Sequence, residues 1–226
     1  MRRAATLALA AIFAAACSGV PAPTSPAASS AKKRTIDAAG VRDAYQKRAG
    51  YTFKVSYSIS GMVGKQPVGG RLVSYQVPPL RRVDTTLGDG RNTQSFTLYI
   101  DESSIVICAL PFTPPCEPIS AEDAASAGLG VVLLDAPILE NPQILDKAEV
   151  SEDRIAGQPV SCFLIREPGS TKLQPGASLN ACYTMDGILM RYGVSTPDFD
   201  IELDGVLLLR DFPPEDVKLP KNAFLR

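Results

Sequence analysis

Strict alternation of apolar and polar residues is clearest in residues 51–60, where Phe53, Val55, Tyr57 and Ile59 alternate with polar side chains. Successive side chains of a β-strand point to opposite faces of the sheet, so this period of two predicts a strand with one buried face. Nine more strand-like runs follow, at residues 68–77, 80–86, 93–100, 104–110, 148–155, 160–166, 179–185, 188–194 and 199–209. The pattern predicts a mainly β protein.

Turn-forming residues separate these runs, and most of the runs follow one another without a helical pattern between them. Asp186-Gly187, which stands between two alternating runs, is the strongest hairpin signal. Strands that are joined by short turns pair in antiparallel order. We therefore expect a single long antiparallel meander sheet, curved into an incomplete barrel, in a mainly β (α+β) domain.

One helix is expected before the first strand. Thr35 or Asp37 can cap it, and Val41 and Tyr45 tend to one of its faces. Gly50 follows the last helical residues and is typical of a helix end. The pattern predicts a helix that ends at about residue 48, directly before the clearest strand.

Residues 118–145 interrupt the series of strands. They begin with what resembles a capped helical turn from Ile119 and continue with a densely apolar run. Such an irregular apolar segment in a β domain either fills the core or covers an opening. In the second case Leu129, Val131 and Leu133 form a lid over the concave face of the sheet.

Residues 1–16 have the pattern of a secretory signal. Arg2 and Arg3 precede an apolar run that is too short to span a bilayer as a mature helix, and small residues precede Cys17. This is the lipobox arrangement of bacterial lipoproteins, in which the cysteine is acylated and becomes the new N-terminus, although Ala14 stands where leucine is usual. The alternative is a plain secretory signal with an incidental cysteine.

Residues 17–34 consist mainly of Pro, Ala, Ser and Thr and predict a disordered tether. Residues 35–226 are enough for one well-buried domain. Acylation of Cys17 would anchor this domain to a membrane of the cell envelope, on the extracytoplasmic side that faces the periplasm or the cell surface.

The charge balance excludes some partners. The chain has 23 basic and 24 acidic residues, and removal of residues 1–16 leaves 21 and 24. No basic face is implied, which argues against nucleic acid as a partner. The sequence has no histidine, so imidazole catalysis and histidine metal sites are excluded. We also find no nucleophile motif or phosphate-binding loop, and we expect a non-enzymatic protein without metal or cofactor.

Four carboxylates, at Asp198, Asp200, Glu202 and Asp204, alternate with apolar residues. A spacing of two places all four on one face of a strand, which suits a solvated outer face. Calcium binding or acid-base glycoside hydrolysis is the alternative, for which the sequence supplies no complementary ligand loop.

Four cysteines follow Cys17, and an even number in an exported protein indicates two disulfides. Three pairings are possible. We favour Cys108–Cys116 and Cys162–Cys182, because each pair brackets one turn or loop. A four-cysteine metal site is the alternative, although the spacings contain no close pair of the zinc-ribbon type.

The order of these elements resembles the Lol-type (LolA/LolB-like) periplasmic lipoprotein carriers and receptors, together with the lipid-carrier lipoproteins of mycobacterial type. The resemblance rests on one N-terminal helix, a long meander, an apolar insertion and a lipobox with a tether. Residues 75–84 resemble that family's second and third strands meeting at a proline turn, and residues 211–220 resemble its closing tail. The four cysteines are not general in the family and indicate a divergent branch.

The resemblance implies a curved sheet that wraps short helices and encloses an apolar cavity for acyl chains. A sheet of about ten or eleven strands leaves space for such a ligand. The alternating residues that we expect to line it are Phe53, Val55, Tyr57, Ile59, Phe96, Leu98, Ile105, Ile107 and Phe163.

We therefore expect a membrane-anchored lipoprotein that binds or carries a lipid or an acylated ligand. The alternative is an envelope sensor or protein-interaction module, which has the same fold with a filled core and contacts an envelope protein. The volume inside the sheet distinguishes these two functions.

Overall fold

The computed structural model describes residues 38–89, 92–101, 103–109, 113–120, 123, 148–166 and 176–224. The chain divides into residues 1–34 and residues 35–226, and the description below concerns the second unit alone. The signal segment, Cys17, the tether and the predicted lid residues Leu129, Val131 and Leu133 lie outside the described residues.

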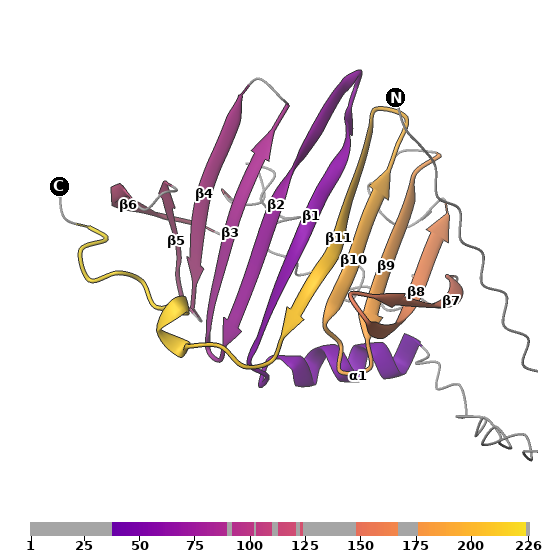
Figure 1. Ribbon diagram of the computed structural model, residues 1–226, viewed down its shortest axis with the longest axis horizontal. Coiled ribbons are helices and arrows are strands. Elements are labelled where there is room, and N and C mark those ends of the chain that lie inside the picture. Colours follow the sequence, from indigo (N-terminus) through magenta and orange to yellow (C-terminus); the bar gives the residue numbers. More distant parts are fainter. Residues whose placement is uncertain are drawn as a thin grey trace, which may run out of the picture. The chain divides into compact units, whose positions relative to one another are not determined.

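One antiparallel sheet of eleven strands makes up most of the described chain (Figure 1). Its spatial order is β6-β5-β4-β3-β2-β1-β11-β10-β9-β8-β7. The strands are β1 (Phe53–Val63), β2 (Gln66–Val77), β3 (Leu80–Gly88), β4 (Thr93–Ile100), β5 (Ile105–Ala109), β6 (Thr113–Ile119), β7 (Glu149–Ile155), β8 (Gln158–Arg166), β9 (Ser178–Thr184), β10 (Leu189–Ser195) and β11 (Phe199–Leu209). The first and last strands pair in the middle, so β6 and β7 remain as edges and the sheet does not close. The predicted fold class is confirmed.

The bounds of β4 and β11 agree with the prediction, whereas β6 was not predicted as a strand. Its sequence, TPPCEPI, contains three prolines and no alternation of apolar and polar residues. Proline cannot donate a ladder hydrogen bond and is tolerated on edge strands, which is where β6 lies. Of the helical turn expected from Ile119, Ile119 itself belongs to β6. Asp123 N–H donates to Ser120 Oγ at 3.0 Å, and the rest of the expected turn lies outside the described residues.

Helix α1 (Ala38–Arg48) lies at one end of the sheet, below β8 to β11 in Figure 1. Val41 is fully buried in the main core. Gly187, in the turn between β9 and β10, packs against the helix so closely that an added Cβ would lie 2.5 Å from the Ala44 carbonyl carbon. Its φ of +78° also favours glycine, so the predicted Asp186-Gly187 hairpin serves both as a turn and as a helix contact.

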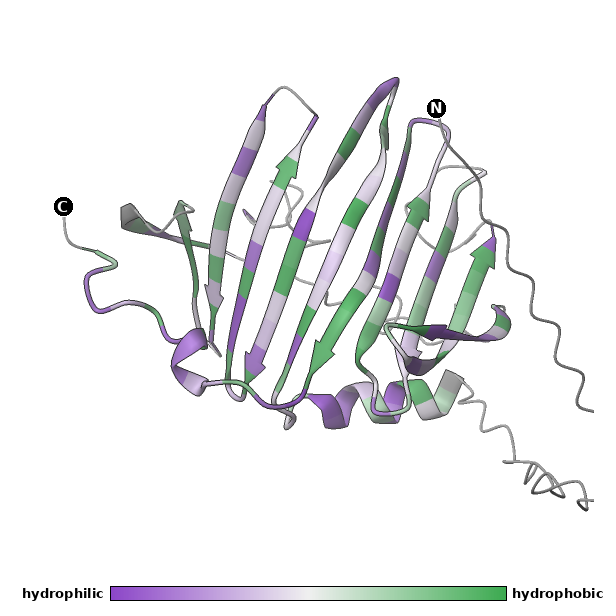
Figure 2. Ribbon diagram, viewed as in Figure 1, coloured by the Kyte–Doolittle hydropathy of each residue, from purple (hydrophilic) through white to green (hydrophobic). Residues whose placement is uncertain are grey.

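The inner face of the sheet carries the main core. We define this face by Tyr57, Leu72 and Leu98, whose side chains are at most 1% exposed. Figure 2 shows the alternation of hydrophobic and hydrophilic residues along the strands that produces it. Burial of each large apolar side chain contributes about 1.5–3 kcal/mol, so this cluster is the main source of stability.

Each half of the outer face is partly covered by another segment of the chain. The C-terminal segment contains η1 (Pro214–Val217), and its Val217 packs on Val73 and Tyr75 of β2. On the other half, β7 crosses in front of its neighbours (Figure 1), and Asp153 accepts a hydrogen bond from Arg191 of β10 at 2.9 Å. The central part of the outer face stays open to solvent between these two covers.

The predicted carboxylate row lies on this outer face. Asp204 and Glu202 of β11 lie 3.0 Å and 3.3 Å from Arg191 Nε. Two of the four carboxylates thus form ion pairs with Arg191 on the outer face. Within the described ranges, no group of acidic and cysteine side chains is arranged to hold a metal ion.

The structure contains two disulfides, in the pairing favoured from the sequence. Cys108 and Cys116 connect β5 and β6, with their Cα atoms 4.5 Å apart. Cys162 and Cys182 lie directly opposite each other on β8 and β9, with Cα atoms 3.9 Å apart. Each bond therefore joins two neighbouring strands.

Candidate functional site

A cavity of about 460 Å³ opens on the inner face, at the end of the sheet remote from α1. Gln76, near one end of β2, donates to the Arg48 carbonyl of the helix at 2.6 Å, whereas Val68, near the other end of the same strand, lines the cavity. The lining residues come from five adjacent strands and the β3–β4 connection: Ile59, Val63, Val68, Leu72, Leu87, Gly88, Asp89, Asn92, Gln94, Ile201 and Leu203.

Register places these side chains together. One row crosses five strands on the inner face, through residues that pair directly with their neighbours: Leu203, Ile59, Gly70, Leu87 and Gln94. Four of the five line the cavity, and the exception is the glycine in the middle. Antiparallel pairing of one alternating pattern per strand is therefore enough to assemble an apolar wall.

Two inner-face glycines beside the cavity allow a close approach of neighbouring strands. A Cβ at Gly70 would lie 2.0 Å from the carbonyl oxygen of Thr86, and one at Gly61 would lie 2.1 Å from that of Asp200. Both distances are shorter than any real contact, so the backbone geometry requires glycine at these two positions. Glycine therefore lets β2 pack against β3, and β1 against β11, without a clash.

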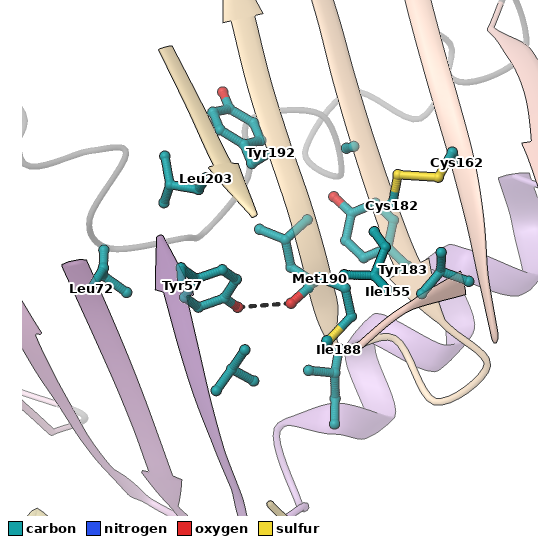
Figure 3. Close-up of a cluster of buried hydrophobic side chains, with 14 of the residues drawn as sticks. Tyr57, Leu72, Ile155, Cys162, Cys182, Tyr183, Ile188, Met190, Tyr192 and Leu203 are labelled. Atoms are coloured by element: carbon teal, nitrogen blue, oxygen red, sulfur yellow. Dashed lines mark hydrogen bonds between the residues drawn. A yellow bond between two sulfur atoms is a disulfide. The ribbon is translucent and has the colours of Figure 1, made fainter. Parts of the chain in front are cut away.

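Below this row the inner face is closed. Tyr57, Leu72 and Thr85 pair across β1, β2 and β3, and each is at most 1% exposed. Tyr57 donates a hydrogen bond from its hydroxyl to the Leu189 carbonyl at 2.7 Å (Figure 3), and burial raises the pKa of this phenol. Tyr57 is therefore a neutral donor in the floor, and the cavity ends at this row.

The mouth of the cavity is polar on one side. Asp89 and Asn92 close the β3–β4 connection through two hydrogen bonds, from Asn92 N–H to Asp89 Oδ1 at 2.8 Å and from Asp89 N–H to the Asn92 carbonyl at 3.2 Å. Gln94 follows on β4 and is exposed. The amides of Asn92 and Gln94 are uncharged groups that both donate and accept hydrogen bonds.

The nine predicted lining residues all belong to one apolar cluster, but of these nine Ile59 alone is among the residues that line this cavity. The other eight pack elsewhere in the cluster. Five are buried: Phe53, Val55, Tyr57, Leu98 and Phe163. Three are half-buried and pack against it: Phe96, Ile105 and Ile107. Contact between these eight and a ligand stays a prediction.

Sequence reasoning missed most of the lining. Ile201 and Leu203 alternate with the carboxylates of β11, so the same pattern that identified an outer face could have assigned them to the inner one. Val63 continues the alternation of β1 beyond Gly61. Asn92 and Gln94 carry no pattern of their own, and their place at the mouth follows from the register of β3 and β4.

A second space, of about 470 Å³, lies beside α1 and differs in chemistry. Its lining includes Arg48, Arg81 and Gln76 together with two prolines. This lining is polar and cationic, whereas the first cavity is walled by aliphatic side chains. The first cavity is therefore the candidate site for an apolar ligand.

Among the described helices, none has the length and apolar character that crossing a membrane requires.

No protein-family model matches the chain, and a comparison with curated proteins finds no match. Solved structures show similarity at low identity. The Mycobacterium tuberculosis lipoprotein LppX is 11% identical with a TM-score of 0.42, and the match covers 74% of this chain and 92% of LppX. The LolA superfamily protein NE2245 from Nitrosomonas europaea is 9% identical with a TM-score of 0.36, covering 82% and 99%.

A chain of the Pseudomonas aeruginosa MucA/MucB complex is 11% identical with a TM-score of 0.44. The match covers 80% of the present chain and spans 61% of the length of the other. A LolA superfamily protein and a mycobacterial lipoprotein are thus both among the similar structures. These are the two groups that the sequence pattern resembles.

Proposed function

We propose that the protein binds a lipid or another acyl-chain ligand in the inner-face cavity. The observation that carries this proposal is a cavity of about 460 Å³ with aliphatic walls and a closed floor. Small-molecule sites are typically apolar spaces of about 300–1,000 Å³ with a few polar groups, which describes this cavity. Each methylene buried there contributes about 0.8 kcal/mol, so a chain of ten would contribute about 8 kcal/mol before the costs of binding.

The location follows from the N-terminal pattern. We propose that Cys17 is acylated and holds the domain at a membrane on the extracytoplasmic side, with residues 17–34 as a flexible tether. The two disulfides support an oxidising compartment. A binding domain on such a tether can reach a ligand at the membrane surface.

We propose a binding or carrier role and no catalysis. The chain has no histidine, and the cavity lining includes a single carboxylate, Asp89, at its mouth. The walls contain no pair of acid and base. A filled-core interaction module is the competing function, and the cavity volume favours the carrier.

The test is native mass spectrometry of the full-length chain with Cys17→Ser, isolated from the cell envelope of the expressing cells. This substitution removes the protein's own acyl chains, so any lipid mass must come from a non-covalent ligand. The expected result is a bound species that collisional activation releases as a lipid. Repeated preparations without any bound lipid, with no uptake of added acyl ligands, would contradict the proposal.

A further inference from the structure

We propose that the cavity takes one acyl chain whose uncharged polar head lies against Asn92 and Gln94, which makes the ligand class a neutral single-chain amphiphile. This inference rests on the proposed function and goes further, because it sets the number of chains and the chemistry of the head. It follows from the volume of the cavity, the closure of its floor and the side chains at its mouth.

The volume fits one chain. A cavity of about 460 Å³ lies in the lower part of the range of about 300–1,000 Å³ that holds one small-molecule ligand. This size suits one acyl chain. A lipid with two such chains needs about twice this volume, and a lipid with three needs about three times as much.

The cavity is closed on the side toward α1. Its floor is the row of Tyr57, Leu72 and Thr85, which is at most 1% exposed. Tyr57 is also held by its hydrogen bond to the Leu189 carbonyl. A second chain would have to displace these closely packed side chains, and packed interiors resist such an insertion by about 1–3 kcal/mol for even small additions.

The polar side of the mouth sets the head chemistry. The Asp89 carboxylate accepts the Asn92 backbone N–H and closes the connection, which leaves the side-chain amides of Asn92 and Gln94 as the neutral hydrogen-bonding groups among the lining residues. An amide can accept from a hydroxyl and donate to an ester or amide carbonyl. The remaining lining at this end, Val63, Val68 and Ile201, is apolar. A head with hydroxyls or a neutral carbonyl therefore fits at this side of the mouth.

The experiment measures binding of three probes to the full-length Cys17→Ser protein after delipidation: 1-palmitoylglycerol, 1,2-dipalmitoylglycerol and palmitate. The expected result is one molecule of 1-palmitoylglycerol per chain, with at least tenfold weaker binding of the two-chain probe and of the anionic probe. Gln94→Leu should weaken 1-palmitoylglycerol binding by about three- to tenfold, as expected for the loss of one hydrogen bond. Gln46→Leu is the matched control, since Gln46 is an exposed glutamine of α1, at the end of the sheet remote from the cavity, and should leave binding unchanged.

The outcomes separate this inference from the proposed function. Equal or tighter binding of 1,2-dipalmitoylglycerol would overturn the single-chain inference and leave the lipid-binding function standing. Tighter binding of palmitate, or equal effects of Gln94→Leu and Gln46→Leu, would overturn the assignment of the head to the amides. Failure of all three probes, with no lipid in the envelope preparation either, would overturn both.

Discussion

Arg82 on β3 donates a hydrogen bond from Nη1 to the backbone carbonyl of Asp216, at 2.9 Å, and so ties the C-terminal segment to the outer face of the sheet. The guanidinium also forms two hydrogen bonds of 2.8 Å to the Asp84 carboxylate. It lies 5.2 Å and 5.6 Å from the ring centroids of Tyr75 and Tyr99. Burial lowers the pKa of Arg82, but the hydrogen bond and the charge of Asp84, together with Tyr99 and Tyr75, outweigh this effect and raise it. The cation is therefore present at all ordinary pH values.

Replacement of Arg82 should release the C-terminal segment. Arg82→Met removes a charged hydrogen bond of about 1.5–3 kcal/mol and leaves Asp84 without its main partner. Hydrogen exchange should then accelerate in residues 211–224, with smaller changes in β9 and β10. Arg71→Met, on the exposed outer face of β2, is the matched control. Equal exchange in the two variants would show that Arg82 does not hold the segment.

Two buried tyrosines of the inner face differ in one respect. The Tyr57 hydroxyl donates to the Leu189 carbonyl at 2.7 Å, whereas the buried Tyr183 hydroxyl has no partner among the described residues. Tyr57→Phe should therefore lower the free energy of unfolding by about 1–2 kcal/mol, because it leaves a buried carbonyl unsatisfied. Tyr183→Phe removes an unpaired polar group and should be neutral or stabilising. Urea unfolding of both variants checks this, and a larger loss for Tyr183→Phe would contradict it.

The disulfides should contribute unequally to stability. In the chain-entropy model, loss of Cys162–Cys182, with a sequence separation of 20, costs about 3 kcal/mol, and loss of Cys108–Cys116, with a separation of 8, costs about 2.5 kcal/mol. Paired substitutions by alanine, compared in urea unfolding, measure both. The two variants should also differ in which part of the structure loosens. Cys116 N–H donates to the Ala223 carbonyl, so loss of the Cys108–Cys116 disulfide should loosen the C-terminal segment.

The disulfide pairing itself can be checked on the non-reduced wild-type protein. Peptide mapping should find Cys108 linked to Cys116 and Cys162 linked to Cys182. A crossed pairing would mean that β5 and β8 do not have the neighbours described above.

Acid should weaken the turn between β9 and β10. Burial raises the pKa of Asp186, but hydrogen bonds from Arg210 and Thr184 outweigh this and lower it below its usual value. A depressed folded-state pKa stabilises the fold above the unfolded value of about 3.9 and loses that contribution as the pH falls through the lower folded pKa. Stability measured between pH 6 and 2 should therefore fall less steeply for Asp186→Asn than for wild type. Parallel curves for the two proteins would contradict this.

Much of the fold could be predicted from the sequence, because each strand carries its own period-two pattern. Phe53 to Ile59 identified β1, and Asp186-Gly187 identified the β9–β10 hairpin. Pairing between β1 and β11, which lie at opposite ends of the chain, has no local signal. The strand β6 was missed because its three prolines argue against a strand. They are tolerated because β6 is an edge strand, and its sequence does not reveal that place in the sheet.

The site was less predictable than the fold. Alternation correctly assigned Ile59 to the inner face, but it cannot say which part of that face is hollow. Gly61 and Gly70 lie beside it on the same face, and their need for glycine comes from carbonyl groups on neighbouring strands, which the sequence does not show. The polar mouth depends on how β3 and β4 pair, which residue types alone do not specify.

The most direct test of the central claim fills the cavity. Val68→Trp places a large side chain in the cavity wall, and Val206→Trp makes the same change at an exposed position of β11, outside the cavity lining. Uptake of a fluorescent acyl probe by the full-length Cys17→Ser protein is measured for both, after circular dichroism has shown that both are folded. Loss of at least tenfold in affinity for Val68→Trp, with no change for Val206→Trp, is the predicted result. Unchanged uptake by folded Val68→Trp would contradict the assignment of the ligand to this cavity.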